Sequence, residues 1–188
     1  MRLLFCIMGD VCNGKYEIYQ YLVDAYHFKP YKTLTTKKVN KNNQFDTFKH
    51  VELGKMLLLE ALGDIVGLKQ IRGEHYGKQL SDIPNGFSVC IIDYLGYLEL
   101  AQKFNTVPIL IQRSRLSRFK LEDCGIKHPD EFLAFENLNK KQYEFALEDK
   151  NLHILKAKDI VETKLLVDEI IEKYLDDLSY DVDLEFEV

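Results

Sequence analysis

Residues 2–26 read RLLFCIMGDVCNGKYEIYQYLVDAY, and this stretch decides the fold class. The continuous apolar run at 2–8 is typical of a strand that a parallel sheet buries on both faces. Glycines at positions 9 and 14 bracket a turn, and from Lys15 to Tyr26 the apolar residues recur at helical spacing. The stretch therefore predicts a strand, a glycine-containing loop and a helix in direct succession.

Apolar runs of strand length alternate with amphipathic segments along the rest of the chain. We expect strands at 32–36, 87–92, 107–111 and 152–155. Helices are expected at 50–63, 94–104, 114–121, 130–146 and 161–175, whereas 67–76 reads as irregular. Strands that alternate with helices indicate βαβ units, so we predict one α/β domain with a parallel sheet flanked by helices.

Composition excludes several classes of protein. The chain has 188 residues, 46% of them hydrophobic and 29% charged, with a net charge of −5. This balance argues against a general nucleic-acid or membrane-surface binder, and no apolar run approaches the roughly 20 residues of a membrane helix. We therefore expect a cytoplasmic protein with no nucleic-acid or membrane partner. Cys6 and Cys90 lie in apolar runs and are expected to be buried, and the histidines lack metal-ligand spacing, so no metal ligand is assigned.

The loop after the first strand, Gly9-Asp10-Val11-Cys12-Asn13-Gly14-Lys15-Tyr16, fits GxxxxGK, the body of a Walker A loop. In such a loop the backbone N–H groups and the following helix N-terminus cradle phosphates, and the lysine reaches the β- and γ-phosphates. These residues are therefore candidates for binding ATP. A plain strand-to-helix turn is the alternative.

Tyr16 departs from the motif, which ends in a serine or threonine whose hydroxyl ligates Mg²⁺. A phenol on a rigid ring does not easily supply a compact ligand, and Mg²⁺ demands near-ideal octahedral geometry. Either water and other groups hold the metal, or nucleotide hydrolysis is weakened.

Four further segments follow in order. They are Thr33-Leu34-Thr35-Thr36-Lys37, Gly73-Glu74-His75-Tyr76-Gly77, Ile91-Ile92-Asp93-Tyr94-Leu95-Gly96, and Lys140-Lys141 with Glu148. In the same order they resemble S-x-(S/T)-T-R, G-x-(Y/H)-Y-G, D-x-D-x-Q-G and K-R-L…E of the guanylate kinase family, which are P-loop nucleoside-monophosphate kinases. The resemblance runs through most of residues 1–175.

The resemblance implies a P-loop fold with a monophosphate-binding insertion at about 33–85 and a lid at about 113–145. Residues 176–188 would form an acidic tail, which we expect to be mobile. The phosphate of the acceptor would be bound by Thr33, Lys37 and Tyr76, with Asp93 near the acceptor or the metal. Catalytic cations would be Lys15 together with Arg115, Arg118 and Lys141 of the lid, since phosphoryl transfer needs clustered positive charge.

Departures from the family pattern bear on specificity. Lys37 and Lys141 replace arginines and lose bidentate phosphate geometry, and a second acceptor-site arginine falls at Asn40 or Lys41. The glutamate that reads guanine falls at about Gly67, and the serine after Y-G is Lys78. Guanine specificity is therefore not implied, because such discrimination depends on buried polar pairing.

Three functions are compatible with these observations. The first is a kinase that transfers the γ-phosphate of ATP, with Mg²⁺, to a (deoxy)nucleoside monophosphate. The second is an eroded kinase-like domain that binds a nucleotide or a protein, and the third is a P-loop enzyme acting on another small acceptor. Small nucleotides are the expected partners, and the oligomeric state is left open, a homodimer included. The lysines and arginines could also be a solvated surface, and Tyr76 and Asp93 structural residues.

Overall fold

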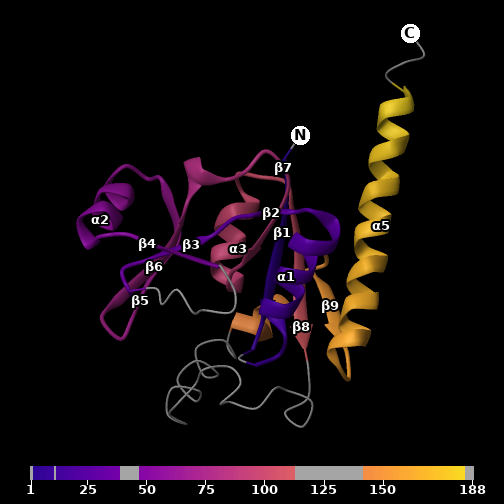
Figure 1. Ribbon diagram of the computed structural model, residues 1–188, viewed down its shortest axis with the longest axis horizontal. Helices are drawn as coiled ribbons and strands as arrows, with labels where there is room; N and C mark the ends of the chain where they lie inside the picture. Colours follow the sequence, from indigo (N-terminus) through magenta and orange to yellow (C-terminus); the bar gives the residue numbers. More distant parts are fainter. Residues whose placement is uncertain (1, 11, 39–46, 113–141, 185–188) are drawn as a thin grey trace.

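Two β-sheets of different size lie side by side in the computed structural model of the chain (Figure 1). The structure describes residues 2–10, 12–38, 47–112 and 142–184, and of residues 176–184 it describes the backbone only. All five strands expected from the sequence are present, and the two sheets differ in how their strands pair.

The larger sheet consists, within the described residues, of five parallel strands in the order β2-β7-β1-β8-β9. Its strands are β1 (Arg2–Gly9), β2 (Lys29–Pro30), β7 (Gly86–Ile91), β8 (Thr106–Gln112) and β9 (His153–Lys156). Ile7 is in register with Ile91, and Gly9 with Ile111. The carboxyl ends of the three central strands therefore meet at one edge, and the predicted parallel sheet is confirmed.

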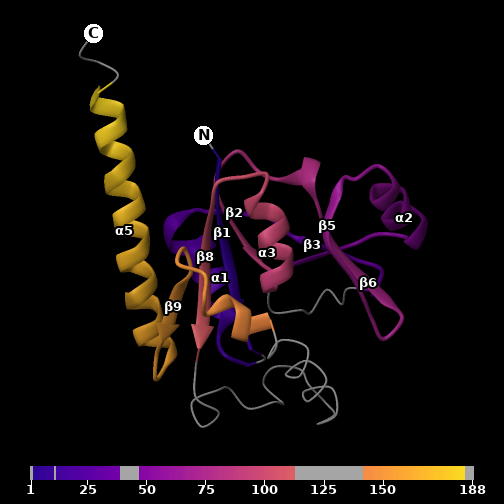
Figure 2. The same cartoon turned by 180° about the vertical axis from the view of Figure 1, so that it is seen from behind.

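Helices cover both faces of the larger sheet (Figures 1 and 2). Because strand side chains alternate, Phe5 and Ile7 pack toward α1 (Lys15–Tyr26) and α5 (Ile160–Leu184). Cys6 and Met8 pack toward α3 (Tyr94–Ala101) and the helical segment 142–146. Cys6 and Cys90 are free thiols with no exposed surface, as predicted.

The smaller sheet has the strand order β4-β3-β6-β5. Its strands are β3 (Thr33–Thr35), β4 (Phe48–His50), β5 (Ile65–Ile71) and β6 (Glu74–Gln79), and the short 3₁₀ helix η1 (Leu80–Asp82) follows. Helix α2 (Leu53–Ala61) covers one face, where Leu34, Met56 and Leu59 form a separate apolar cluster. The opposite face is turned toward the larger sheet.

The expectation of an irregular segment at 67–76 is wrong, because this segment forms most of the antiparallel pair β5–β6. A register shift between Val66 and Lys69 interrupts the alternation that marks a strand in sequence. Gly67 and Gly73 both have positive φ, so they serve a bulge and a turn rather than a break in the sheet.

Helix α5 continues to Leu184, beyond the expected end at 175, so the closing helix is longer than predicted. Its first half is anchored in the core by Val167, Ile170 and Ile171, and the remainder projects past the rest of the molecule (Figure 1). Extending a helix that is already formed needs no new nucleus, and acidic residues do not interrupt it. The helix expected at 114–121 and most of that at 130–146 lie outside the described residues.

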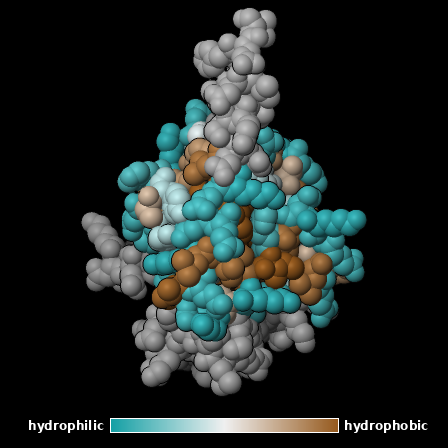
Figure 3. All heavy atoms as spheres, turned by 90° about the vertical axis from the view of Figure 1, so that its right-hand side faces the viewer, coloured by the Kyte–Doolittle hydropathy of each residue, from teal (hydrophilic) through white to brown (hydrophobic). Residues whose placement is uncertain are grey.

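The surface on the α5 side is mixed in character. Figure 3 shows mostly hydrophilic side chains with a band of apolar ones across the lower half of this face. Exposed apolar residues of α5 include Val161 and Leu165. Among the described residues, no helix combines the length and the apolar character needed to span a membrane.

Candidate functional site

The loop between β1 and α1 has the backbone geometry that its glycines predict. Gly9 has φ 150°, and a Cβ there would lie 2.7 Å from the carbonyl oxygen of Ile111 and would collide with the side-chain amide of Asn13. Gly14, with φ 95°, is the N-cap of α1 and leaves the first turn without a side-chain cap. The N–H groups of that turn and the positive end of the helix dipole are thus directed at the loop, which suits an anion.

Asn13 fixes the loop against the neighbouring strand. Its side chain is 1% exposed, and its Nδ2 donates to the carbonyl oxygen of Ile111 at 2.5 Å. Its Oδ1 is buried without a hydrogen-bond partner in the described part of the chain. Residue 11 of the predicted loop lies outside the described residues, so Val11 is not placed.

Lys15 opens α1 and folds back over the loop. Its Nζ donates to the carbonyl oxygen of Asp10 at 2.8 Å and lies 5.7 Å from the centre of the Tyr16 ring. A cation at the mouth of a loop lined by N–H groups can contact the phosphates of a bound nucleotide. The residues present therefore fit the phosphate groups of ATP.

Tyr16 is the last residue of the loop motif and the second residue of α1. Burial raises the pKa of this half-buried phenol to about 12, and the nearby Tyr76 phenol and Glu17 carboxylate add to the increase. The phenol is therefore neutral at ordinary pH and close to Tyr76, which the resemblance places at the acceptor phosphate. Sequence reasoning treated Tyr16 only as a departure from the motif, and the structure adds this proximity.

The face of the smaller sheet opposite α2 carries the predicted acceptor residues. Tyr76 lies on β6 and Thr33 on β3. Because side chains alternate along a strand, Lys78 lies on the same face as Tyr76, and Thr35 on the same face as Thr33. Lys78 Nζ donates to Thr33 Oγ1 at 2.9 Å and to the carbonyl oxygen of Tyr31 at 3.0 Å. Tyr76 is half-buried, and this burial raises the pKa of its phenol.

Thr35 and Lys37 continue this face toward the solvent. The backbone N–H of Lys37 donates to Thr35 Oγ1 at 3.1 Å, and the Thr35 hydroxyl is hydrogen-bonded to Tyr76. The side chain of Lys37 is exposed, and its ammonium group has no bonding partner within the described ranges. The structure thus brings Thr33 and Tyr76 together on one sheet face and leaves Lys37 at its edge.

Asp93 follows β7 at the edge where the phosphate loop lies. Its Oδ1 accepts from the backbone N–H of Gly96 at 2.9 Å and caps α3, while its Oδ2 pairs with Lys69 Nζ of β5 at 2.5 Å. The Asp93 side chain is 13% exposed, so this ion pair is largely shielded and joins the two sheets. Its carboxylate is therefore engaged on both oxygens.

These contacts decide how well the site suits Mg²⁺. Tyr16 presents a phenol where the motif has a compact hydroxyl, and Asp93 is committed to a lysine and a helix N-terminus. Within the described residues, no three His, Cys, Asp or Glu side chains come together as metal ligands. The described side chains thus fit phosphates but offer no set of side-chain ligands for Mg²⁺.

Several predicted residues cannot be located, and others emerge only from the structure. Arg115, Arg118 and Lys141 lie outside the described residues. Sequence reasoning missed the contribution of Lys69 and Thr35, and it noted Lys78 only as a departure from the family. Strand alternation from Tyr76 would have put Lys78 on the same face, had residues 67–76 been recognised as part of a hairpin.

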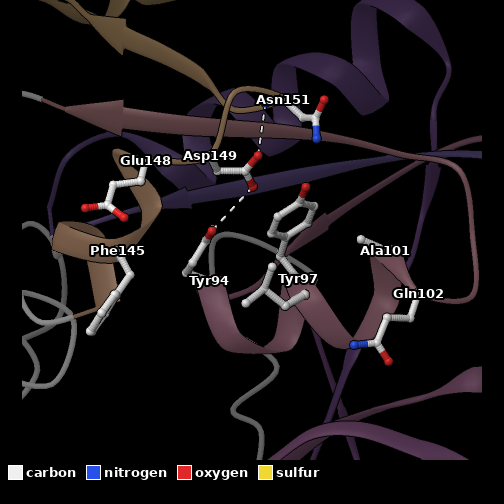
Figure 4. A pocket seen from close by; sticks show the side chains of 9 residues that line it. Tyr94, Tyr97, Ala101, Gln102, Phe145, Glu148, Asp149 and Asn151 are labelled. Atoms are coloured by element: carbon white, nitrogen blue, oxygen red, sulfur yellow. Dashed lines mark hydrogen bonds between the residues drawn. The ribbon is translucent and has the colours of Figure 1, made fainter.

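A hollow of about 550 Å³ lies elsewhere, between α3 and the segment that leads into β9 (Figure 4). In Figure 4 the hydroxyl of Tyr94 points to Asp149, with an oxygen–oxygen distance of 3.4 Å, and the backbone N–H of Asn151 caps the same carboxylate at 3.0 Å. Glu148, which belongs to the lid pattern in the sequence, lines this hollow rather than the phosphate loop. No residue of the loop contributes to it, so it is not the candidate site.

Comparison with known proteins supports the fold but not a close relationship. No protein-family model matches the sequence. No curated protein sequence matches it at a significant level either. The structure is similar to the crystal structure of guanylate kinase from Anaplasma phagocytophilum, with a TM-score of 0.58 and 17% sequence identity over 92% of this chain and 85% of that one. The chain therefore has a guanylate kinase-like α/β fold, with a five-stranded parallel sheet flanked by helices.

Proposed function

We propose that the chain is a nucleoside-monophosphate kinase, which transfers the γ-phosphate of ATP to a (deoxy)nucleoside monophosphate. The observation that supports the proposal is the interaction between Tyr16, at the end of the loop, and Tyr76 of the smaller sheet. Tyr16 neighbours Tyr76, so a donor phosphate on the loop and an acceptor on the smaller sheet would face each other. The guanylate kinase-like fold supports the same arrangement.

On the donor side, the chain contributes positioning and charge. The N–H groups of the loop and of the first turn of α1 would hold the phosphates of ATP, and Lys15 would release the Asp10 carbonyl to contact the β- and γ-phosphates. Mg²⁺ would supply charge neutralisation while bound by the nucleotide phosphates and water, without the one or two carboxylates that kinase sites usually add. Tyr16 and Asp93 would then act on the nucleotide without ligating the metal.

On the acceptor side, Thr33, Tyr76 and Lys37 would bind the monophosphate. The lid residues Arg115, Arg118 and Lys141 would add positive charge around the transferring group, as the resemblance implies. Catalysis would consist of alignment and electrostatic stabilisation, with no covalent intermediate on the protein. Each of these contributions is larger when the site excludes water.

A second candidate is an inactive binding module of the same fold. It is favoured by Tyr16 in place of the metal-binding hydroxyl and by the engagement of both Asp93 oxygens. Such a protein would still bind nucleotides on the loop but would not turn them over.

A coupled phosphotransfer assay separates the two candidates. The full chain is incubated with ATP, Mg²⁺ and a panel of nucleoside and deoxynucleoside monophosphates, and thermal shifts are measured on the same samples. The kinase predicts turnover with at least one monophosphate. Stabilisation without turnover supports the binding module, because a ligand that prefers the folded state raises its stability. If the samples show no turnover and no thermal shift, both candidate functions are contradicted.

A further inference from the structure

Lys78 is a buried cation without a carboxylate partner in the described part of the chain. The residue is 3% exposed, and its ammonium group is bonded to the carbonyl oxygen of Tyr31 and the hydroxyl of Thr33. The Tyr31 ring centre lies 5.0 Å away. Burial lowers the pKa of Lys78, the nearby thiols of Cys90 and Cys6 partly offset this decrease, and repulsion from Lys69 adds to it. Burying a charge without an opposite one is expensive, so a cation retained here calls for a specific role.

The direction of the bond to Thr33 is fixed by chemistry. An ammonium group can only donate, so Thr33 Oγ1 accepts, and the Thr33 hydroxyl keeps its single proton to donate elsewhere. No described residue accepts that proton. On the sheet face that carries Tyr76, Thr33 is therefore held as a hydrogen-bond donor.

Thr35 resembles Thr33, because its hydroxyl oxygen also accepts a hydrogen bond from a nitrogen donor. The Lys37 N–H donates to Thr35 Oγ1, and the hydrogen bond from Thr35 to Tyr76 works against the rise in the Tyr76 pKa that burial causes. Because Thr35 Oγ1 accepts from the Lys37 N–H, the Thr35 hydroxyl also keeps its own proton to donate. Two hydroxyl donors on one face, each with an upstream donor, match an anion such as a phosphate monoester.

We propose that Lys78 is a positioning residue for the acceptor phosphate, which acts by donating to Thr33 Oγ1 and so orienting the Thr33 hydroxyl toward the anion. The identity of that anion rests on the proposed kinase function. Lys78 stands where the family resemblance has a serine, so this role belongs to the present chain.

The test is a cycle of the variants Lys78→Met, Thr33→Val and the double variant, assayed for kcat and for KM of both substrates. Lys78→Met is expected to raise KM for the monophosphate about tenfold, the effect of one charge-assisted hydrogen bond, while kcat and KM for ATP change much less. Thr33→Val is expected to have a similar effect, and the double variant no more than Thr33→Val alone. The proposal would be overturned if the increases in KM for the monophosphate in the two single variants added up in the double variant. It would also be overturned if Lys78→Met changed only kcat.

Controls separate positioning from folding. Methionine fills nearly the same volume, and replacing a buried charge by an apolar side chain is often tolerated. Lys49→Met alters an exposed lysine of the same sheet, which pairs with Asp82 at 3.2 Å, and is expected to leave both KM values unchanged. Thr33→Ser keeps the hydroxyl and is expected to retain the KM of the unmodified protein. If Thr33→Val also had the KM of the unmodified protein for the monophosphate, the Thr33 hydroxyl would have no role, and the proposal would fail whether or not Lys78→Met folds.

The outcomes also distinguish this inference from the proposed function. If the unmodified chain turns over and Lys78→Met keeps its KM, the inference fails and the kinase stands. If a nucleoside monophosphate stabilises the unmodified chain without turnover, the kinase fails, and the same cycle measured by Kd decides on Lys78. If neither turnover nor stabilisation occurs, both are overturned.

Discussion

Asn13 Nδ2 donates a hydrogen bond of 2.5 Å to the carbonyl oxygen of Ile111, which joins the loop between β1 and α1 to the adjacent strand β8. Ile111 is also in register with Gly9, so the beginning and the end of the loop are both held at the same point of the sheet. A loop fixed in this way presents its N–H groups without reorganising when a ligand arrives, which favours binding.

Gly9→Ala tests this arrangement. The new Cβ would lie 2.7 Å from the Ile111 oxygen, against the Asn13 side chain and at a φ that L residues rarely adopt. We expect a loss of about 1–3 kcal/mol in unfolding free energy from this strain. Nucleotide-induced stabilisation should also be lost. Thermal and urea unfolding with and without ATP measure both effects.

Gly54→Ala is the matched control for that substitution. Gly54 lies in α2, where a Cβ meets no atom within 4 Å. Alanine in a helix is more favourable than glycine by about 0.5–1 kcal/mol, so this variant should be slightly more stable and respond normally to ATP. If Gly9→Ala and Gly54→Ala had the same stability and the same stabilisation by ATP, the constraint at Gly9 would be contradicted.

Lys15→Ala is expected to reduce phosphotransfer about a hundredfold or more while changing the unfolding free energy by less than about 1 kcal/mol. The reason is that a lysine at the mouth of the loop would contact the transferring phosphates, whereas substitutions on the protein surface usually change stability little. Lys55→Ala, at an exposed position of α2, controls for the loss of a surface charge. Turnover by Lys15→Ala at the rate of Lys55→Ala would remove Lys15 from the catalytic residues.

The fold was predictable where the signal is local. The apolar run before Gly9, the glycines and the helical spacing after Lys15 specify β1, the loop and α1, and the buried strands β7 and β8 are evident from their continuous apolar composition. The hairpin β5–β6 was not predictable, because the register shift after Val66 hides its alternation. The end of α5 was misjudged because an acidic composition was taken for a loss of structure.

The site was predictable only in part, for a physical reason. Tyr76 and Thr33 were selected by the family resemblance, and the structure places them on one sheet face. The bonds that orient them were not foreseen, because Lys78 and Thr33 are 45 residues apart and Lys69 and Asp93 are 24 apart. No local pattern encodes such pairs, because the first arises when β3 and β6 pair within the smaller sheet and the second when the two sheets pack. The roles of Arg115, Arg118 and Lys141 stay predictions.

Tyr16→Ser restores the compact hydroxyl of the motif and is expected to maintain or raise Mg²⁺-dependent turnover, with half-maximal activity at a lower Mg²⁺ concentration. Tyr16→Phe keeps the ring without a hydroxyl ligand and should show no such gain. Magnesium titrations at fixed ATP compare the two variants. A large loss of turnover in Tyr16→Ser alone would instead assign the aromatic ring a role beside Tyr76.

Alkaline pH is expected to destabilise the folded chain. Burial raises the pKa of Tyr16 and of Tyr97 to about 12, and it also raises those of Tyr26 and Tyr31. Unfolded tyrosines lose their protons near pH 10, so above about pH 10 the unfolded state binds fewer protons and the unfolding free energy falls. Below pH 10 this stabilisation is fully present. The pKa of Lys78 is lowered, so Lys78 makes the unfolding free energy rise with pH, but it is one group against the four tyrosines.

Urea unfolding at a series of pH values between 8 and about 11.5 measures this dependence. The urea midpoint should be nearly constant up to about pH 9.5 and then decline. Tyr16→Phe should make the decline shallower, because it removes one phenol that loses its proton more easily in the unfolded state. A midpoint that rose above pH 10 would contradict the burial of these phenols.

Asp168 of α5 holds α1 through two tyrosines, and its removal is expected to destabilise the fold without affecting the site. Its Oδ1 accepts from the Tyr21 hydroxyl at 2.8 Å and from the Tyr26 hydroxyl at 2.7 Å, and Lys164 lies over the Tyr21 ring at 4.8 Å. Asp168→Ala leaves both partly buried phenols without this acceptor, which should cost about 1–3 kcal/mol. That corresponds to a fall in Tm of about 2–4 °C per kcal/mol in a domain of this size.

A mutant cycle identifies the source of that loss. If the two hydroxyls account for it, Asp168→Ala should cost much less in a chain that already carries Tyr21→Phe and Tyr26→Phe, because the partners share one network. Glu169→Ala, at an exposed neighbouring position of α5, should change Tm little. Phosphotransfer by the Asp168→Ala protein well below its Tm should equal that of the unmodified chain, since α5 packs on the sheet face opposite Lys78 and Tyr31. An additive cycle would show instead that Asp168 stabilises α5 by itself, because the two tyrosines would then have no share in its effect.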